Sequence, residues 1–326
     1  MPTIEQGNSV ARRTDFTPNG QRMNIHAPVP PADNLTVRVG CRLIYDAASP
    51  VPVMFNLKPR MDAGRILQAE LLRFGNDLPA TAFTDTHDNT HFRLVLPAGR
   101  TEVVHDAIVS VPDRPDNAEF TSANPLSPHE LPAEVLRYTL PSRYCDSDKL
   151  TNFAWEKFGL IPHGLPRAQA ISDWLHNQIE YRFASGRPDL SAWDVIQRGY
   201  GVCRDFAHTF IALCRTFNLP ARYVTGHLPD IGYTDPGSPM DFHAYAEVFI
   251  DGHWFTFDPR YNVPRIGRVT VARGLDAVNG AFATIYGAAT LSYFEVWAYQ
   301  VAAGAVSIGD PIDLSKRLDG TPEIRR

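Results

Sequence analysis

The spacing of apolar residues changes along this chain, and the change limits the folds that are open to it. Residues 35–45 alternate apolar and polar side chains, which is typical of a strand with one buried face. Residues 92–96 repeat this alternation, and 103–111 do so less cleanly. After Cys203 the apolar residues instead recur every three or four positions, as in an amphipathic helix. This order predicts an α+β protein, in which an α+β domain follows an N-terminal β-sandwich domain.

The length of 326 residues exceeds what one hydrophobic core usually organises, so we expect two domains. The apolar segment 291–301 is assigned to the second of them, as a closing strand. The predicted parts are a disordered tail, a β-sandwich domain, a surface linker rich in Pro, Asp and Asn, an α+β domain and a loose C-terminal tail. Their ranges are 1–22, 23–112, 113–141, 142–305 and 306–326.

Composition argues against several classes of partner. The formal net charge of −5 offers no basic patch for nucleic acid, and no apolar run approaches the length of a membrane span. The polar first residues do not resemble a signal peptide. The cysteines Cys41, Cys145, Cys203 and Cys214 are scattered without a CxxC pair, so we expect a reduced, cytoplasmic protein. Their spacing to histidines fits no zinc pattern, and we expect neither metal nor cofactor.

Cys203 lies where a glycine-rich turn meets the predicted amphipathic helix. Gly199 and Gly201 allow a tight backbone approach just before it. The N-terminus of a helix carries partial positive charge and free N–H groups, which favour a thiolate and are able to hold an oxyanion. The alternative is that Cys203 is a small buried apolar residue, as Cys214 is expected to be. The position alone does not decide between these readings.

A predicted hairpin brings a histidine and an aspartate together. Asp251-Gly252 is a strong signal for a two-residue turn, and that turn places Tyr245 opposite Asp258. His243 then lies on the same face as Asp258, as its diagonal neighbour, with Cβ atoms roughly 7 Å apart. A slip of one residue in the register would separate them. With the turn in place, an imidazole and a carboxylate are within reach of each other.

Cysteine, histidine and aspartate are the parts of a thiol nucleophile, its base and the group that orients the base. Asp258 follows large apolar residues, where an unpaired carboxylate is costly, and His243 would offset that cost. Taken singly, the two would be a strand histidine and a turn aspartate. Secondary candidates are Gln197 as an oxyanion donor, together with the Cys203 N–H. The alternative for Gln197 is a polar residue on a short helix. Proposed pocket walls are Tyr245 together with Trp193 and Tyr200, and for the last two core packing is the alternative; His208 is read as structural.

Five segments of the chain resemble the transglutaminase-like superfamily, and more closely its bacterial branch described as cysteine proteases. They are 136–145, 201–208, 219–226, 241–245 and 254–259. The resemblance spans roughly 30 to 300 and implies a papain/transglutaminase-like core, in which a helix carrying the cysteine packs on an antiparallel sheet. It also implies that Cys203 is the nucleophile, His243 the base and Asp258 its orienting partner. Arg204 departs from the tryptophan that follows the nucleophile in animal crosslinking enzymes, and nothing resembles their calcium-binding segments.

The function predicted from these residues is acyl transfer from an amide through a thioester on Cys203. The partner is a peptide or protein substrate with an amide carbonyl. Hydrolysis is slightly favoured over transfer to an amine, because no acceptor-amine site is recognisable. A non-catalytic peptide-binding module is the competing class. The presence of all three predicted residues argues against it.

Overall fold

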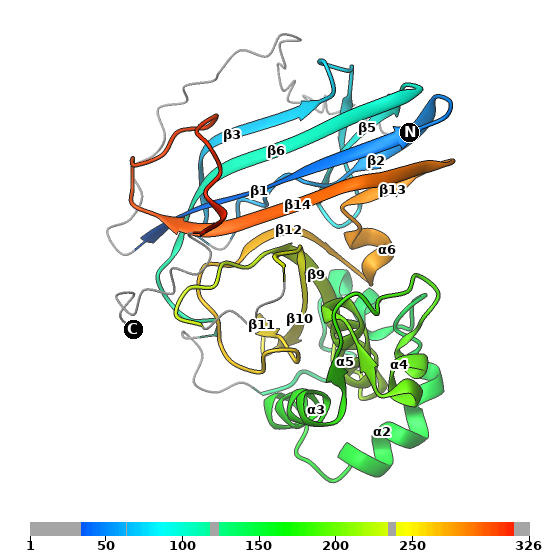
Figure 1. Ribbon diagram of the computed structural model, residues 1–326. Coiled ribbons are helices and arrows are strands. Elements are labelled where there is room, and N and C mark those ends of the chain that lie inside the picture. The colour runs from blue at the N-terminus through cyan, green and yellow to red at the C-terminus, as the bar shows by residue number, and fades with distance from the viewer. Residues whose placement is uncertain (1–33, 63, 118–123, 234–238, 316–326) are drawn as a thin grey trace, which may run out of the picture.

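Two antiparallel sheets, built mainly from the first third of the chain, pack face to face as a sandwich (Figure 1). The computed structural model describes residues 34–62, 64–117, 124–233 and 239–315. The first sheet has the order β14 (Ala289–Val301), β1 (Asn34–Ala47), β6 (Gly99–Pro112) and β3 (Ile66–Phe74). The second has the order β13 (Ala283–Ile285), β2 (Val51–Phe55), β5 (Thr90–Leu96) and β4 (Thr81–Thr84). We call these eight strands the sandwich unit.

The long strand β1 takes part in two apolar cores. Its alternating apolar residues are buried, as the sequence predicts. Cys41 and Leu43 pack in the cluster that fills the sandwich. Val37 and Val39, nearer the start of the strand, pack in a second cluster with Val269 of strand β12 (Val269–Gly274). One face of the first sheet therefore joins the sandwich to the rest of the molecule.

The remaining elements form a helical unit around a third antiparallel sheet. This sheet has the order β11 (His253–Phe257), β10 (His243–Ile250), β9 (Ala221–His227) and β12. The helix α5 (Cys203–Thr216) packs against β9 and β10, and its apolar residues lie at the centre of the largest core cluster. The other helices are α2 (Thr151–Phe158), α3 (Leu165–Gln178), α4 (Ala192–Arg198) and the one-turn α6 (Ala277–Gly280), with a 3₁₀ turn, η2 (Ser147–Leu150), before α2. A short parallel bridge joins β7 (Glu180–Tyr181) to β8 (Tyr200–Gly201).

The C-terminal strand differs from its predicted assignment. We expected 291–301 to close the second domain, but β14 pairs with β1 from Thr36 opposite Val301 to Ala47 opposite Ala289 (Figure 1). Its apolar side chains supply partners for a strand far away in sequence, which spacing within the segment does not reveal. The described part of the predicted loose tail is also anchored. Arg38 donates hydrogen bonds to the carbonyl oxygens of Asp310 and Pro311.

The predicted surface linker is likewise part of the packed structure. It contains α1 (Ala133–Leu136) and the 3₁₀ turn η1 (Arg137–Thr139), and Val135 and Tyr138 are buried against Phe249 and Trp254. Near its start, Asn117 exchanges two 2.8 Å hydrogen bonds with the backbone of Thr256 in β11. Prolines and polar residues suit an irregular path, but several apolar residues among them, such as Val135 and Tyr138, are buried.

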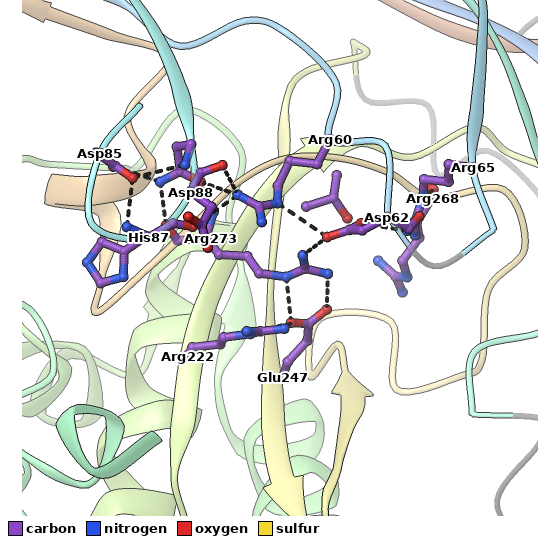
Figure 2. Close-up of polar contacts among 12 residues, drawn as sticks. Arg60, Asp62, Arg65, Asp85, His87, Asp88, Arg222, Glu247, Arg268 and Arg273 are labelled. Carbon is purple, nitrogen blue, oxygen red and sulfur yellow. Dashed lines mark hydrogen bonds and ion pairs between the residues drawn. The ribbon is translucent and has the colours of Figure 1, made fainter. Parts of the chain in front are cut away.

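Arginine side chains connect the third sheet to the segment that follows β2 (Figure 2). Arg273 on β12 contacts Glu247 of β10 at 2.9 Å and also pairs with Asp62, which follows β2. Arg222 of β9 contacts the same Glu247 carboxylate at 2.6 Å. These buried charges are paired, so the contact between the units does not leave charge uncompensated. The tie helps to hold the third sheet in place relative to the sandwich.

Candidate active site

A cavity of about 740 Å³ opens between the first turn of α5, the edge of β9 and β10, and the segment 277–284 that leads into β13. Cys203 and His243 both lie in its wall. Much of the remaining lining is aromatic or aliphatic. It includes Tyr144, Tyr181, Phe183, Tyr223, Leu228, Met240, Phe242, Tyr261, Val278 and Phe282. The cavity therefore offers an apolar surface around one thiol and one imidazole.

The turn before Cys203 is fixed by local contacts. Gly199 ends α4 with a φ of 73°, a left-handed conformation that glycine adopts without strain. The Asp205 carboxylate accepts the Val202 N–H at 3.0 Å and so caps the start of α5. It lies so close to Gly201 that an added Cβ would stand 2.7 Å from the Asp205 Cβ. These contacts place the thiol at the first residue of the helix, where the N–H groups have no intrahelical acceptors.

The environment of Cys203 holds its thiol in the protonated form. Burial raises the pKa of Cys203 to about 11, although the Arg260 guanidinium and the Ala244 N–H act to lower it. This differs from the expectation that the helix N-terminus would favour the thiolate. Desolvation of a charge in this apolar wall outweighs these favourable contacts. A base must therefore remove the proton when the sulfur attacks.

The hairpin register expected from the Asp251-Gly252 turn is the observed one. Both turn residues have positive φ, 52° and 80°, and Ile250 pairs with His253. The imidazole of His243 reaches across the strands, and its Nε2 lies 2.7 Å from Oδ2 of Asp258. Both side chains are almost fully buried, at 5% and 2% exposed. The turn thus brings together the two residues that the sequence paired.

The contact with Asp258 leaves the other nitrogen of His243 available. Because the carboxylate is ionised, Nε2 carries the proton and Nδ1 is the acceptor. Burial lowers the pKa of His243, against the pull of Asp258, so the resting imidazole is neutral near pH 7. The ring centroids of Tyr245 and Tyr261 lie 6.3 and 5.3 Å from the centroid of the imidazole, and these rings limit its rotation. A neutral, oriented imidazole is suited to take a proton from a thiol.

Asp258 is held by an arginine that sequence reasoning missed. Nη2 of Arg268 donates to Oδ2 of Asp258 at 3.0 Å, and Nε donates to Asp116 at 2.8 Å. Although burial acts to raise it, His243 and Arg268 hold the pKa of Asp258 well below its usual range. Arg268 lies between Gly267 and the strand β12, and Asp116 in the predicted linker. Neither position carries a motif, so only the folded chain shows that they meet.

The secondary candidates lie elsewhere, and these predictions need correction. Gln197 and Trp193 are four residues apart on α4, so they share its exposed face, opposite the buried Val195. Tyr200 is stacked under two guanidinium groups, 3.8 Å from Arg182 and 4.3 Å from Arg198. The Tyr245 hydroxyl bonds to Thr270 at 3.0 Å within the sheet. Of these four side chains, none lies in the described lining of the cavity.

His208 has a structural environment, in line with its predicted role. Its Nε2 accepts the N–H of Ala277 at 3.1 Å, and its ring stacks on Tyr144 with centroids 4.9 Å apart. Burial lowers its pKa well below the ordinary range, so the ring is neutral. Through Ala277 it fixes the segment that forms one wall of the cavity.

Across the part of the chain that the structure describes, no group of three or more His, Cys, Asp or Glu side chains is arranged to hold a metal ion. None of the described helices combines the length and apolarity that a membrane crossing requires.

Comparison with known proteins gives matches of two kinds. The sequence profile of the transglutaminase-like superfamily matches residues 157–259. The crystal structure of a putative cysteine protease from Cytophaga hutchinsonii superposes with a TM-score of 0.74 at 30% identity, covering 83% of this chain and 92% of that one. An uncharacterized protein of Mycobacterium leprae (strain TN) is 29% identical over 99 residues, 29% of this chain and about a third (34%) of its own length.

Proposed function

Since this chain belongs to the transglutaminase-like superfamily, we propose that it is a cysteine enzyme that transfers the acyl group of a peptide amide through a thioester on Cys203. One observation carries the proposal. The imidazole of His243, bonded at 2.7 Å to the buried Asp258 carboxylate, lies in the wall of the cavity that Cys203 also lines at the start of α5. A thiol, a neutral base and a charged orienting group share one site.

The first half-reaction forms the thioester. His243 Nδ1 takes the thiol proton while the sulfur of Cys203 attacks the amide carbonyl carbon. The oxyanion that develops accepts a hydrogen bond from the free N–H of Cys203 at the helix N-terminus. The imidazolium formed is stabilised by Asp258, whose charge Arg268 keeps in place. It then gives its proton to the leaving nitrogen as the C–N bond breaks.

The second half-reaction releases the acyl group. Water or an amine attacks the thioester, and His243 takes a proton from the attacking group and returns one to the sulfur. Water makes the protein a peptidase or amidase, and an amine makes it a transamidating enzyme. We favour water, because the similar protein of Cytophaga hutchinsonii is described as a putative cysteine protease.

Alkylation kinetics test the first half-reaction without a known substrate. Iodoacetamide labelling across pH 5 to 9, read by peptide mass spectrometry, is expected to modify Cys203 first, because the other three cysteines are free but fully buried. The rate should fall in His243→Ala. Labelling of Cys203 that is slower than for free cysteine, and unchanged in the variant, would overturn the proposal and favour a non-catalytic peptide-binding module.

Product analysis then separates the two outcomes of the second half-reaction. A panel of unlabelled peptides is incubated with the enzyme, with and without a fluorescent primary amine. New peptide termini or deamidated side chains support hydrolysis, and amine incorporation supports transamidation. Cys203→Ala is the control for both.

We also propose a reducing location such as the cytoplasm. The support is chemical, since the described cysteines are all free thiols, three of them in apolar cores. Fractionation of the native host, with immunodetection of the protein in each fraction, would test this.

A further inference from the structure

The cavity wall carries a positive charge on Arg260. Arg260 lines the cavity together with Cys203 and His243. Within the described residues its guanidinium makes neither a hydrogen bond nor an ion pair. It is nevertheless close enough to the thiol to lower the pKa of Cys203 against the effect of burial. An arginine with five unused donors in an apolar cavity is suited to meet an anion.

The geometry of Arg260 is fixed by its neighbours. Its guanidinium carbon lies 3.7 Å from the ring centre of Tyr181 and 4.6 Å from that of Tyr261. The backbone turns at this point, because the carbonyl of Asp258 accepts the N–H groups of Tyr261 and Asn262 at 3.1 and 2.7 Å. The same turn therefore positions the carboxylate behind His243 and the cation beside the cavity. Stacking on tyrosines orients a guanidinium and leaves its edge free for a ligand.

The other charged groups of the cavity are engaged differently. Arg204 donates to the carbonyl of Arg187 at 2.6 Å and to Asp205 at 3.3 Å. Asp230 pairs with Arg265 at 3.4 Å. Among the described residues, Asp241 interacts with Arg260 at a longer range than an ion pair, and burial raises the pKa of Asp241 to about 6. Arg260 therefore provides the positive charge that is open to a ligand.

We propose that Arg260 selects acyl donors that carry a carboxylate next to the amide under attack, such as an acidic residue or a chain-terminal carboxylate. This inference rests on the proposed function, because it assumes that Cys203 reacts with an amide in this cavity. The apolar lining accommodates the rest of the donor. Planar pairing of guanidinium with carboxylate fixes the distance between the anion and the reacting carbon.

Two reagents of nearly equal size test the inference without a substrate. Iodoacetate carries a carboxylate where iodoacetamide carries a neutral amide, and both alkylate thiols. The measurement is the ratio of their rates at Cys203, divided by the same ratio for free cysteine at the same pH. We expect the wild-type value to exceed one, to fall about tenfold in Arg260→Met, and to be only partly kept in Arg260→Lys, which retains the charge without the planar guanidinium.

Arg182 offers a matched control. It also stacks on a tyrosine, but it pairs with Glu180 at 2.6 Å and lies outside the cavity lining, so Arg182→Met should leave the ratio unchanged. Equal slowing of both reagents in Arg260→Met would mean that Arg260 only stabilises the thiolate, and would overturn the inference. An unchanged ratio would overturn it too. Labelling of wild type by both reagents that is slower than for free cysteine, and unchanged in His243→Ala, would instead overturn the proposed function, and the inference with it.

Discussion

The two units of this molecule each contain a cysteine, a histidine and a carboxylate close together, with different surroundings. In the helical unit these are Cys203, His243 and Asp258. In the sandwich unit Cys41 on β1 pairs directly across from His105 on β6, and His105 Nε2 lies 3.1 Å from Oε1 of Glu70 on β3. Residue types alone do not distinguish the two sets.

The two sets differ in how accessible the cysteine is and in the backbone next to it. Cys41 and His105 are fully buried between sheets, and burial raises the pKa of Cys41 to about 12. Glu70 is also neutralised by Lys58 at 2.8 Å. Cys203 instead begins a helix, with free N–H groups beside it, and lines a cavity that admits a ligand. A thiol–imidazole–carboxylate set becomes a candidate site only where the chain leaves space and oxyanion donors next to it.

The largest difference between the two sets is expected when each cysteine is replaced by alanine. Cys203→Ala should abolish acyl transfer, by about 10⁴-fold or more, because the nucleophile is lost. Cys41→Ala should keep the activity but lower the free energy of unfolding by about 1–2 kcal/mol, since it leaves a void in the sandwich. Peptide turnover and urea unfolding measure the two effects. Comparable activity in both variants would remove Cys203 from the mechanism.

The histidines form the second test. His243→Ala should lower turnover by about 10² to 10⁴-fold, the usual contribution of a general base. His105→Ala should leave turnover near the wild-type rate and cost about 1–3 kcal/mol of stability, because Glu70 loses its contact with the buried His105. Steady-state kinetics and thermal unfolding are run on the same preparations. A loss of turnover in His105→Ala, without a change in unfolding, would contradict the comparison.

A buried arginine contacts an aspartate in each unit, and substituting these two arginines tests the difference between the units again. Arg268→Met leaves Asp258 with His243 as its partner and removes the ion pair of Asp116, while Arg38→Met removes that of Asp106, which Arg38 contacts at 2.8 Å in the sandwich. Each should destabilise the fold by about 3–5 kcal/mol, the cost of leaving a buried charge unpaired. Only Arg268→Met should also lower kcat, by about tenfold to a hundredfold, with partial rescue in Arg268→Lys. Assays are made well below the unfolding temperature. Equal kcat in the two methionine variants would show that Arg268 is purely structural.

The last pair of predictions concerns the pH dependence of stability and of activity. The partners of Glu70 lower its pKa to about 2 against the effect of burial. Its stabilising contribution is present above the ordinary value near 4.5 and is lost as the pH falls towards 2, by about 3 kcal/mol at most. Glu70→Gln should flatten the fall in unfolding free energy over this range, measured by urea titration from pH 6 to pH 3.

Activity should respond to pH through a different group. The neutral imidazole of His243 is the active form, and burial lowers its pKa. Turnover should therefore persist below the ordinary histidine range and fall only as the pH drops through the lowered value. The pH–rate profile of Glu70→Gln should match that of wild type. A shift in the low-pH side of the pH–rate profile of Glu70→Gln would show that the sandwich residues affect turnover at Cys203.

Short-range signals predicted the parts of the site that depend on local geometry. The Asp251-Gly252 turn sets the hairpin register, and with it the contact between His243 and Asp258. The glycine-rich turn and the apolar stripe likewise place Cys203 at the start of a helix. The alternation of 35–45 predicts a buried strand face, because a strand's period depends only on neighbouring residues.

Contacts between distant segments were not predictable from the same signals. The pairing of Asp116 with Arg268 joins residues 152 positions apart, and each is an ordinary charged residue in sequence. The aromatic walls proposed for the pocket failed for a related reason. Trp193 and Tyr200 lie near Cys203 along the chain, but the direction of α4 and the stacking of Tyr200 on arginines point them elsewhere. The cavity is completed by residues 277–284 instead.

The pairing of β1 with β14 also has a consequence for synthesis on the ribosome. β1 is the first of the described strands to emerge and β14 the last, so one edge of β1 waits for its partner until residues 289–301 have been made. An unpaired edge of twelve residues, 36–47, is open to association with other chains. We expect release of fragments that stop before residue 289 to give aggregation rather than a soluble sandwich, even though most of the sandwich strands are present in them.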